Sequence, residues 1–390
     1  MSSGGGEGRT WIWALIGGGV MIGAAMVGGA SLPGWLHAGL LGVGGLLVVF
    51  GACESMIKSV DGLARRRRMN EFVAGTMAGL ASNIPELVML AFVLAATPRV
   101  GFIVSAVTLH VGAAAFGIYS ALLPRDERGA AAMPKPLVEL STDLYACAGG
   151  AFFATGAIML LMYAFDAGKH KGDALGAGDL YVLGGALLFV EVVAVTRLVK
   201  RFGGSGEKSV SAAEGKDEPA PPLPSITAIA LYGLLGIAAS VLGGHAVGDF
   251  ADVLVGTLAR AGYPRMVGAL ILSLFASAGA FVMVASAHVK GMYDVALANA
   301  SGQVNQVPFV VMPVALILLA AFGQTGVIPL TPSGGVLPID LDTTSVLLLG
   351  FPSMVILWKA IQDDGKVNWL ETATMIAIFG LTIYFLAAHG

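Results

Sequence analysis

Residues 72–98 read FVAGTMAGLASNIPELVMLAFVLAATP, and this stretch decides the fold class. It is long enough to cross the hydrocarbon core of a bilayer, which takes about 20 predominantly apolar residues in a helix. Its only ionisable residue, Glu86, lies near the centre. The stretch therefore predicts a transmembrane helix that carries a single acid at mid-membrane.

The composition extends this interpretation to the whole chain. Hydrophobic residues make up 56% of the 390 positions and charged residues only 12%, against about a quarter charged in soluble domains. The first apolar run is too long for a signal-peptide core and predicts a retained helix. We expect an all-α polytopic membrane protein with about eleven transmembrane helices in the lipid bilayer. The predicted spans lie near 11–30, 36–60, 71–96, 99–123, 143–165, 179–199, 226–258, 265–288, 292–320, 343–361 and 367–388.

The distribution of basic residues predicts the orientation. With the N-terminus inside, sixteen of the 22 Lys and Arg residues fall in inside segments and five in outside segments. Because basic residues favour the cytosolic side, we expect a cytosolic N-terminus and an outside C-terminus in a bacterial-type inner or plasma membrane. The basic residues sit in short loops and the net charge is −3, which argues against nucleic acid as a partner. Cys53 and Cys147 lie in apolar runs and are interpreted as packing residues.

One polar segment divides the chain. Residues 203–225 are small, charged and proline-rich, which is typical of a cytosolic linker. We expect an N-terminal extra helix over 1–34, a first membrane repeat over 35–202 and a second over 226–390. The tripeptide Leu-Ala-Arg occurs in both, at 63–65 and 258–260. An odd number of helices separates these units, so they enter the membrane from opposite sides and form an inverted repeat of five plus five helices.

Glu86 is the first candidate site residue. A carboxylate at mid-membrane is costly unless it faces the protein interior and has a partner. Ser82 precedes it by one turn, and Asn83 is adjacent to Ser82. Pro85 has no backbone N–H, so we expect a helix break that frees the carbonyl of Ala81 for a cation. The alternative is a protonated Glu86 hydrogen-bonded to a neighbouring helix.

The second half supplies uncharged polar groups. Asn299, Gln303 and Gln306 are spaced i, i+4, i+7, so they form a stripe on one helix face that lipid would penalise. Asn305 adds a further amide, and Ser277 lies in the preceding span. This stripe is interpreted as the other half of a cation site, with hydrogen bonding between helices as the alternative. We also expect Pro308 and Pro313 to break this span.

His110, in the span 99–123, has two interpretations. A histidine inside the membrane can be a proton-linked group or a neutral, hydrogen-bonded core residue. Ser105 and Thr108 lie near it in the same span. The pattern leaves both readings open.

Four short motifs follow one another in the first half: Gly51-Ala52, Leu63-Ala64-Arg65, Asn70-Glu71-Phe72-Val73 and Ser82-Asn83-Ile84-Pro85-Glu86-Leu87. Their order resembles the first alpha repeat of the cation/calcium exchanger superfamily. The segment DVALANASGQVNQVPFVVMP, residues 294–313, is similar to the proton-coupled calcium exchanger branch. The resemblance implies exchange of a cation, commonly Ca²⁺, against Na⁺ or H⁺ by alternating access, with Glu86 as the metal-binding acid.

The resemblance also marks a departure. Members of that superfamily carry an acid in both repeats, but the second acid falls on Ala280 in this chain. Calcium prefers 6 to 8 oxygen ligands, several of them charged. A single carboxylate with amides, hydroxyls and carbonyls favours a monovalent ion or a proton-linked cycle.

The predicted function is a secondary cation antiporter with no cofactor beyond the transported Ca²⁺, Na⁺ or H⁺ and no catalytic residue. A non-transporting membrane scaffold or sensor that retained the fold is the alternative, because the second acid is missing. An intramembrane hydrolase is disfavoured, since no Ser/His dyad motif and no HExxH pair is present. The sequence leaves the oligomeric state undetermined.

Overall fold

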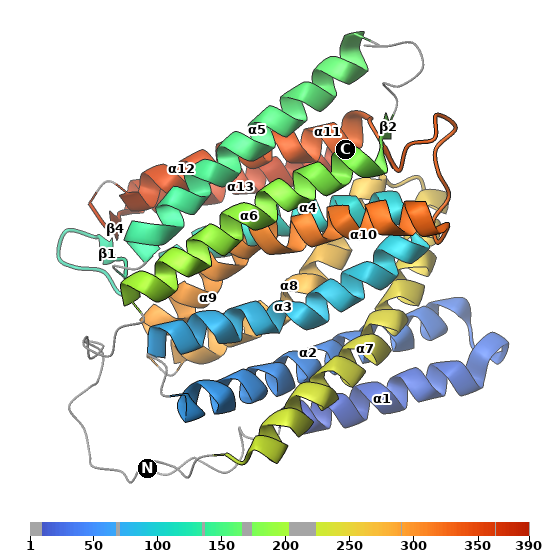
Figure 1. Cartoon of the computed structure of the whole chain (residues 1–390), viewed down its shortest axis with the longest axis horizontal. Helices are drawn as coiled ribbons and strands as arrows, with labels where there is room; N and C mark the ends of the chain where they lie inside the picture. Colours follow the sequence, from blue (N-terminus) through green and yellow to red (C-terminus); the bar gives the residue numbers. More distant parts are fainter. Residues whose placement is uncertain are drawn as a thin grey trace. The chain divides into compact units, whose positions relative to one another are not determined.

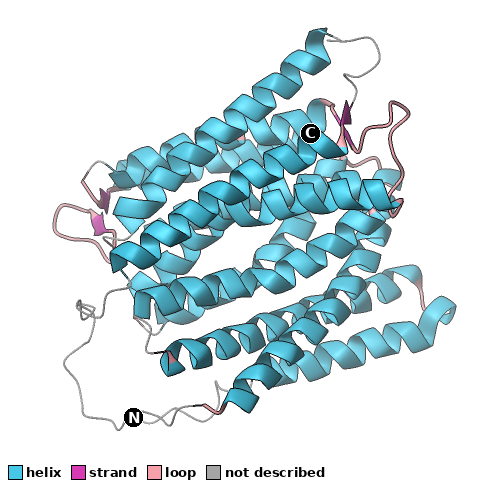
Figure 2. Cartoon of the chain, in the orientation of Figure 1, coloured by secondary structure: helices cyan, strands magenta, loops and turns pink. Residues whose placement is uncertain are grey.

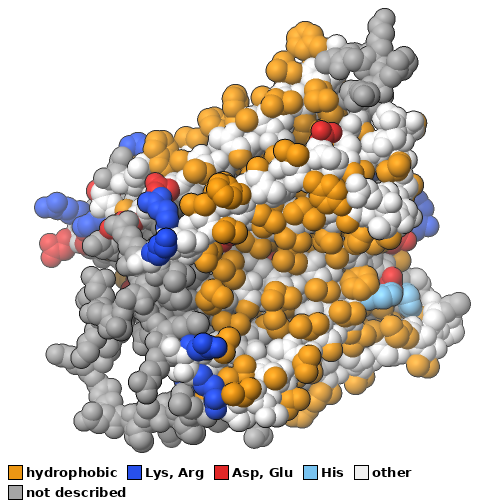
Figure 3. All heavy atoms as spheres, viewed as in Figure 1, with side chains coloured by type: hydrophobic (Ala, Val, Ile, Leu, Met, Phe, Trp, Pro, Cys, Tyr) orange, Lys and Arg blue, Asp and Glu red, His pale blue; other side chains and the backbone are white. Residues whose placement is uncertain are grey.

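The computed structural model describes residues 10–67, 71–134, 137–165, 174–202, 224–289, 291–362 and 364–389. The described chain is almost entirely helical (Figures 1 and 2). Eleven segments within it are long and apolar enough to span a membrane, which confirms the predicted polytopic all-α class. Apolar side chains cover the visible faces of helices such as α6, as expected for surfaces that face lipid (Figure 3). Residues 203–223 of the predicted linker lie outside the described residues.

Thirteen α-helices in the described chain make these eleven spans. The helices before the linker are α1 (Thr10–Gly28), α2 (Gly34–Arg66), α3 (Glu71–Ala96), α4 (Pro98–Ala121), α5 (Thr142–Phe165) and α6 (Ala177–Phe202). The helices after it are α7 (Ile226–Arg260), α8 (Arg265–Val289), α9 (Tyr293–Gln306), α10 (Met312–Thr325), α11 (Leu341–Leu348), α12 (Gly350–Gln362) and α13 (Trp369–His389). A short 3₁₀ turn, η2 (Gly29–Ser31), follows α1, and two π-helical turns, η3 (Leu137–Ser141) and η4 (Val307–Val311), precede α5 and α10. Helices α9 and α10 form one span through η4, and α11 and α12 form another.

The chain packs as two compact units, which are described separately. The first comprises Met1–Met89 and Val192–Ala246, and the second comprises Leu90–Glu191 and Val247–Gly390. Each unit draws residues from both sides of the linker. The two predicted repeats are consecutive stretches of sequence, whereas the packed units are not. The repeat boundaries therefore stay a prediction.

Close helix packing holds the first unit together. Gly18 of α1 and Gly44 of α2 face each other so closely that a methyl group on Gly18 would lie 2.6 Å from the carbonyl oxygen of Gly44. Small residues at such contacts let helix backbones approach within a membrane. The hydroxyl of Ser55 on α2 donates to the carbonyl of Tyr232 on α7 at 2.7 Å, and Ser59 donates to Ile229 at 2.8 Å. Helix α2 is thus fixed to both α1 and α7.

Helix α4 is the centre of the second unit. Nearly all its residues from Val100 to Ser120 are buried, and it packs against α8, α9, α11 and α13. Its large side chains, Phe102 and Phe116, are at most 1% exposed. Polar groups on α4 are therefore held among other helices rather than in lipid.

Two small β-ribbons confirm the alternation of the spans. Strand β1 (Ala131–Ala132) follows α4 and pairs with β4 (Lys366–Val367), which precedes α13. Strand β2 (Ala174–Leu175) follows α5 and pairs with β3 (Leu337–Pro338), which precedes α11. The loops after the fourth and tenth spans therefore meet at one end of this unit, and those after the fifth and ninth spans meet at the other. This is the arrangement that eleven single crossings require.

Charged groups reinforce the β1–β4 end. Arg125 donates to the carbonyls of Ser120 and Val367 and stacks 3.8 Å from the ring centre of Trp369. Lys366 donates to Asp126 at 2.9 Å. That hydrogen bond, with the backbone N–H donors of Ala130 and Arg128, lowers the pKa of the exposed Asp126 to about 2. The carboxylate therefore stays ionised, and this contact is lost only as the pH falls towards 2.

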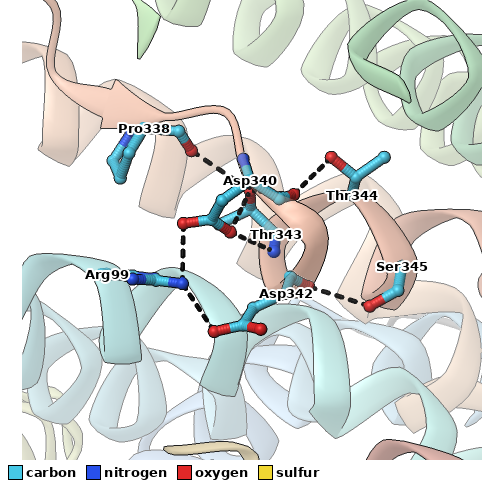
Figure 4. A network of polar contacts seen from close by, with 7 residues as sticks. All are labelled: Arg99, Pro338, Asp340, Asp342, Thr343, Thr344 and Ser345. Carbon is cyan, nitrogen blue, oxygen red and sulfur yellow. Dashed lines mark hydrogen bonds and ion pairs between the residues drawn. The ribbon is translucent and has the colours of Figure 1, made fainter. Parts of the chain in front are cut away.

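A second polar network fastens the opposite end (Figure 4). Arg99, in the first turn of α4, contacts Asp340 at 2.7 Å and Asp342 at 2.5 Å. Asp340 also accepts from the backbone N–H of Thr343 at 2.9 Å and so caps α11, since the first N–H groups of a helix have no partner within it. One cation thereby joins the start of α4 to the start of α11.

Candidate functional site

Glu86 lies on α3 in the first packed unit and is half-buried. Ser82 donates its hydroxyl to the carbonyl of Gly79 at 2.7 Å, and the thiol of Cys53 on α2 lies 3.4 Å from the carbonyl of Ser82. Asn83 is 7% exposed. No hydrogen bond joins Glu86 to another residue of the described chain. Because an ionised carboxylate at this depth is costly, it needs either a proton or a cation.

The expected helix break at Pro85 is wrong. Helix α3 continues through this proline to Ala96. Proline removes one N–H donor, but the neighbouring helical hydrogen bonds remain, and transmembrane helices tolerate this loss. The polar environment of Glu86 is therefore built on a continuous helix rather than on unwound backbone.

The expected breaks at Pro308 and Pro313 are also wrong. The two prolines are five residues apart, and the chain between them forms the π-helical turn η4. The N–H of Met312 donates to the carbonyl of Val307, which is an i to i+5 bond. A wider turn accommodates the missing donors without ending the span.

Helix α8 runs parallel to α4 with a fixed register. The hydroxyl of Ser273 donates to the carbonyl of Val104 at 3.1 Å, and Tyr119 lies 3.4 Å from His288. Both pairs have a sequence separation of 169 residues, so the two helices keep step over their length. This register brings Ser277, one turn after Ser273 on the same face, level with Thr108 of α4.

Ser277 is fully buried, and its hydroxyl has no hydrogen-bond partner among the described residues. A buried unsatisfied hydroxyl is uncommon and calls for an explanation such as a bound ion or water. The predicted role of Ser277 as a ligand is compatible with this placement.

The α4–α8 register also locates Ala280. The position lies one turn beyond Ser277 and is level with Val111 and Gly112 of α4. Gln303 of α9 packs at the same level, because a methyl group on Gly112 would lie 3.7 Å from its side chain. Gln303 is 9% exposed, and its Nε2 has no partner within the described chain. An uncharged amide thus lies at the level where the resemblance predicts an acid.

The rest of the predicted amide stripe is less uniform. Asn299 and Gln306 are half-buried, and both have a polar or electrostatic partner in the protein. Asn305 is buried but lies on another face of α9, two residues from Gln303. Of the three predicted stripe residues, Gln303 is the one that the structure buries without a partner for its amide nitrogen among the described residues.

His110 lies on a different face of α4 from Thr108 and Gly112, since it is two residues from each. Its Nε2 lies 3.0 Å from the carbonyl of Val346 on α11, so Nε2 carries the hydrogen and donates it. Nδ1 has no partner in the described part of the chain. His110 is thus a link between α4 and α11 and does not join the α4 face that carries Gly112.

Sequence reasoning missed Tyr145 on α5. Its side chain is fully buried, and its hydroxyl has no hydrogen-bond partner among the described residues. A tyrosine within an apolar run carries no signal that separates it from ordinary core packing.

The comparisons with known proteins agree with this architecture. The family described as sodium/calcium exchanger protein matches residues 228–388. A Ca(2+)/H(+) antiporter from Aphanothece halophytica is 27% identical over 121 residues, which are 30% of this chain and 29% of that protein. The match thus spans less than a third of the curated relative.

Solved structures match over nearly the whole chain. The H+/Ca2+ exchanger CAX superposes with a TM-score of 0.63 and 13% identity, covering 97% of this chain and 91% of that one. The native structure of YfkE gives 0.60 and 14%, covering 97% and 99%. The sodium-calcium exchanger NCX_Mj gives 0.53 and 14%, covering 88% and 98%. At these identities the structures establish the fold. The chain is thus similar in fold to solved cation exchangers, and residues 228–388 are similar in sequence to the sodium/calcium exchanger protein family.

Proposed function

We propose that the chain is a secondary cation antiporter that exchanges Ca²⁺ or a monovalent cation for protons by alternating access. Glu86 is the charged ligand and the proton acceptor, with Ser82 and Asn83 beside it. Ser277, Asn299, Gln303 and Gln306 supply uncharged ligands. The observation that carries the proposal is that Glu86 has no hydrogen-bond partner in the described chain, although it lies within a transmembrane helix.

Two further observations support it. The hydroxyl of Ser277 and the amide nitrogen of Gln303 are buried and unsatisfied among the described residues. The sequence and fold matches include proteins named as Ca²⁺/H⁺ and sodium–calcium exchangers. Ala280 favours the alternative of a non-transporting scaffold or sensor, because such a chain would have lost its second acid without penalty.

Flux through purified protein separates the two functions. In proteoliposomes with an imposed pH gradient, an antiporter moves Ca²⁺, Na⁺ or K⁺ in the direction opposite to the protons. The rate of proton release then depends on which cation is present. A scaffold gives the same flux as empty liposomes for every ion. Cation-dependent proton release in the absence of a membrane potential supports exchange, and its absence with all three ions rejects the proposal.

The orientation of the membrane protein gives a separate prediction. In a chain whose Cys53 and Cys147 are replaced by serine, we introduce Glu127→Cys next to β1 and Ser333→Cys before β3. Because these loops follow an even and an odd number of spans, they lie on opposite sides of the membrane. A membrane-impermeant maleimide applied to intact cells should label Ser333→Cys, and should label Glu127→Cys only after permeabilisation. The reverse result rejects the cytosolic N-terminus, and labelling of both from one side rejects the eleven-span topology.

A further inference from the structure

A second polar cluster lies between α5 and α9, apart from the face of α9 that packs on α4. Ser301 and Asn305 are one turn apart on α9 and share a face. Gln303, between them in sequence, points to the other side of the helix, where it meets Gly112. Tyr145 of α5 lies beside Ser301. Tyr145 therefore faces the side of α9 that carries Ser301 and, one turn on, Asn305.

All three side chains are buried, with exposed fractions of 0% for Tyr145, 3% for Ser301 and 8% for Asn305. The Asn305 Oδ1 has no hydrogen-bond partner among the described residues, and the Tyr145 hydroxyl makes no bond of ordinary hydrogen-bond geometry there, although it lies close enough to Ser301 to interact with it. Ser301 donates to the carbonyl of Ala298 on its own helix through a long bond of 3.4 Å. Leaving several such groups unsatisfied in one buried place is costly, and native proteins avoid it.

The chemistry of the cluster identifies its ligand. Tyrosine offers a donor and an acceptor, serine can serve as either, and the Asn305 Oδ1 is an acceptor. None of the three carries a charge, so a metal ion held here would lack any compensating carboxylate from the cluster at membrane depth. A water molecule needs two to four polar partners and no charge. Water molecules commonly bridge polar side chains that lie close together in a protein interior.

We propose that Tyr145, Ser301 and Asn305 bind a structural water between α5 and α9, and that this water positions α9 during exchange. The positioning role rests on the proposed function, whereas the water site does not. Loss of the water is expected to alter the movement or placement of α9, because the water contacts this helix. The cluster and Gln303 are on different faces of α9. Loss of the water therefore leaves the ligands on the α4 side in place.

Radiolytic hydroxyl-radical labelling of the purified full chain tests the water site. Radicals formed from a bound water oxidise the adjacent side chain even when it is buried. We expect Tyr145 to be oxidised roughly tenfold faster than the equally buried aromatic residues Phe116 and Phe379, which pack among apolar groups. The Asn305→Leu variant should reduce Tyr145 oxidation to the Phe116 level. Oxidation of Tyr145 at that level in the unmodified chain overturns the site, as does labelling that persists in Asn305→Leu.

Transport kinetics test the positioning role. Tyr145→Phe removes one oxygen and keeps the ring, so it is expected to fold normally. We expect its maximal exchange rate to fall about threefold, with the half-saturating cation concentration unchanged. Tyr119→Phe is the matched control, because that hydroxyl lies 3.4 Å from His288 and does not belong to the cluster of Tyr145, Ser301 and Asn305. A change in half-saturation without a change in rate overturns the positioning role. If the unmodified chain exchanges no ion, the proposed function fails, and the labelling experiment still decides the water site.

Discussion

Replacing Glu86 by glutamine is expected to abolish cation-dependent proton release, reducing the exchange rate by roughly 100-fold or more. The carboxylate is the only charged group among the proposed ligands. A cation that enters the membrane without it meets no compensating charge, at a cost of several kcal/mol. Each 1.4 kcal/mol is a factor of ten in affinity, so a cost of several kcal/mol lowers the cation affinity by about 100-fold or more. Glutamine also cannot take up or release the exchanged proton.

The same substitution is mild for the fold. Glu86 makes no hydrogen bond to another described residue, and glutamine has nearly the same shape. We therefore expect Glu86→Gln to elute as a single species and to melt within a few degrees of the unmodified protein. Glu127→Gln, in the exposed loop after α4, is the control and should exchange normally. Equal flux through the unmodified chain and Glu86→Gln would remove Glu86 from the mechanism, while reduced flux in both variants would indicate a general effect.

Hydropathy predicted the spans well because the physics is local. A bilayer demands about 20 consecutive apolar residues, and each helix meets that demand on its own. The alternation of inside and outside loops follows from the count of spans, and the two β-ribbons confirm it. The hydrophobic length that a transmembrane helix needs can therefore be recognised from the sequence of that helix alone.

The consequences of proline were mispredicted for a related reason. Pro85, Pro308 and Pro313 each remove a donor, and the sequence gives no measure of how the helix responds. Helix α3 continues through Pro85, whereas the chain forms a π-turn at the two later prolines. The five-residue spacing of Pro308 and Pro313 is the one local signal that could have indicated this turn.

Contacts between distant segments could not be predicted at all. Arg99 contacts Asp340 and Asp342 across more than 240 residues of sequence. The segment around Arg99 and the segment around the two aspartates each suggest, on their own, only a solvated loop. Tyr145 becomes a candidate site residue only together with Asn305, which is 160 positions away in the sequence. Asn305 lies in an amide-rich stretch whose predicted ligands are on a different face of the helix. The candidate ligands were recognisable by residue type, but their faces and unsatisfied atoms required the packing of α4, α5, α8 and α9.

Installing an acid at position 280 gives the second large expected effect. The α4–α8 register places Ala280 level with Gly112, against which Gln303 packs. Ala280→Glu would add a carboxylate close to a buried amide that has an unsatisfied donor among the described residues. Calcium affinity rises with the number of charged oxygen ligands, whereas a monovalent cation gains less from a second carboxylate. We therefore expect the half-saturating Ca²⁺ concentration to fall about tenfold or more relative to that for Na⁺.

The control for this variant is Ala278→Glu. Position 278 is two residues away on α8 and faces another direction. A glutamate at this position therefore adds the same charge and bulk as Ala280→Glu without lying close to Gln303. Calcium binding to both variants can be measured by isothermal titration in detergent, with thermal melting as the test of folding. If Ala280→Glu and Ala278→Glu fold and bind Ca²⁺ equally, the level of Ala280 is not part of the cation site. If only Ala280→Glu gains affinity, the alanine accounts for a site with a single carboxylate, and selectivity in this chain depends on the charge at one turn of α8.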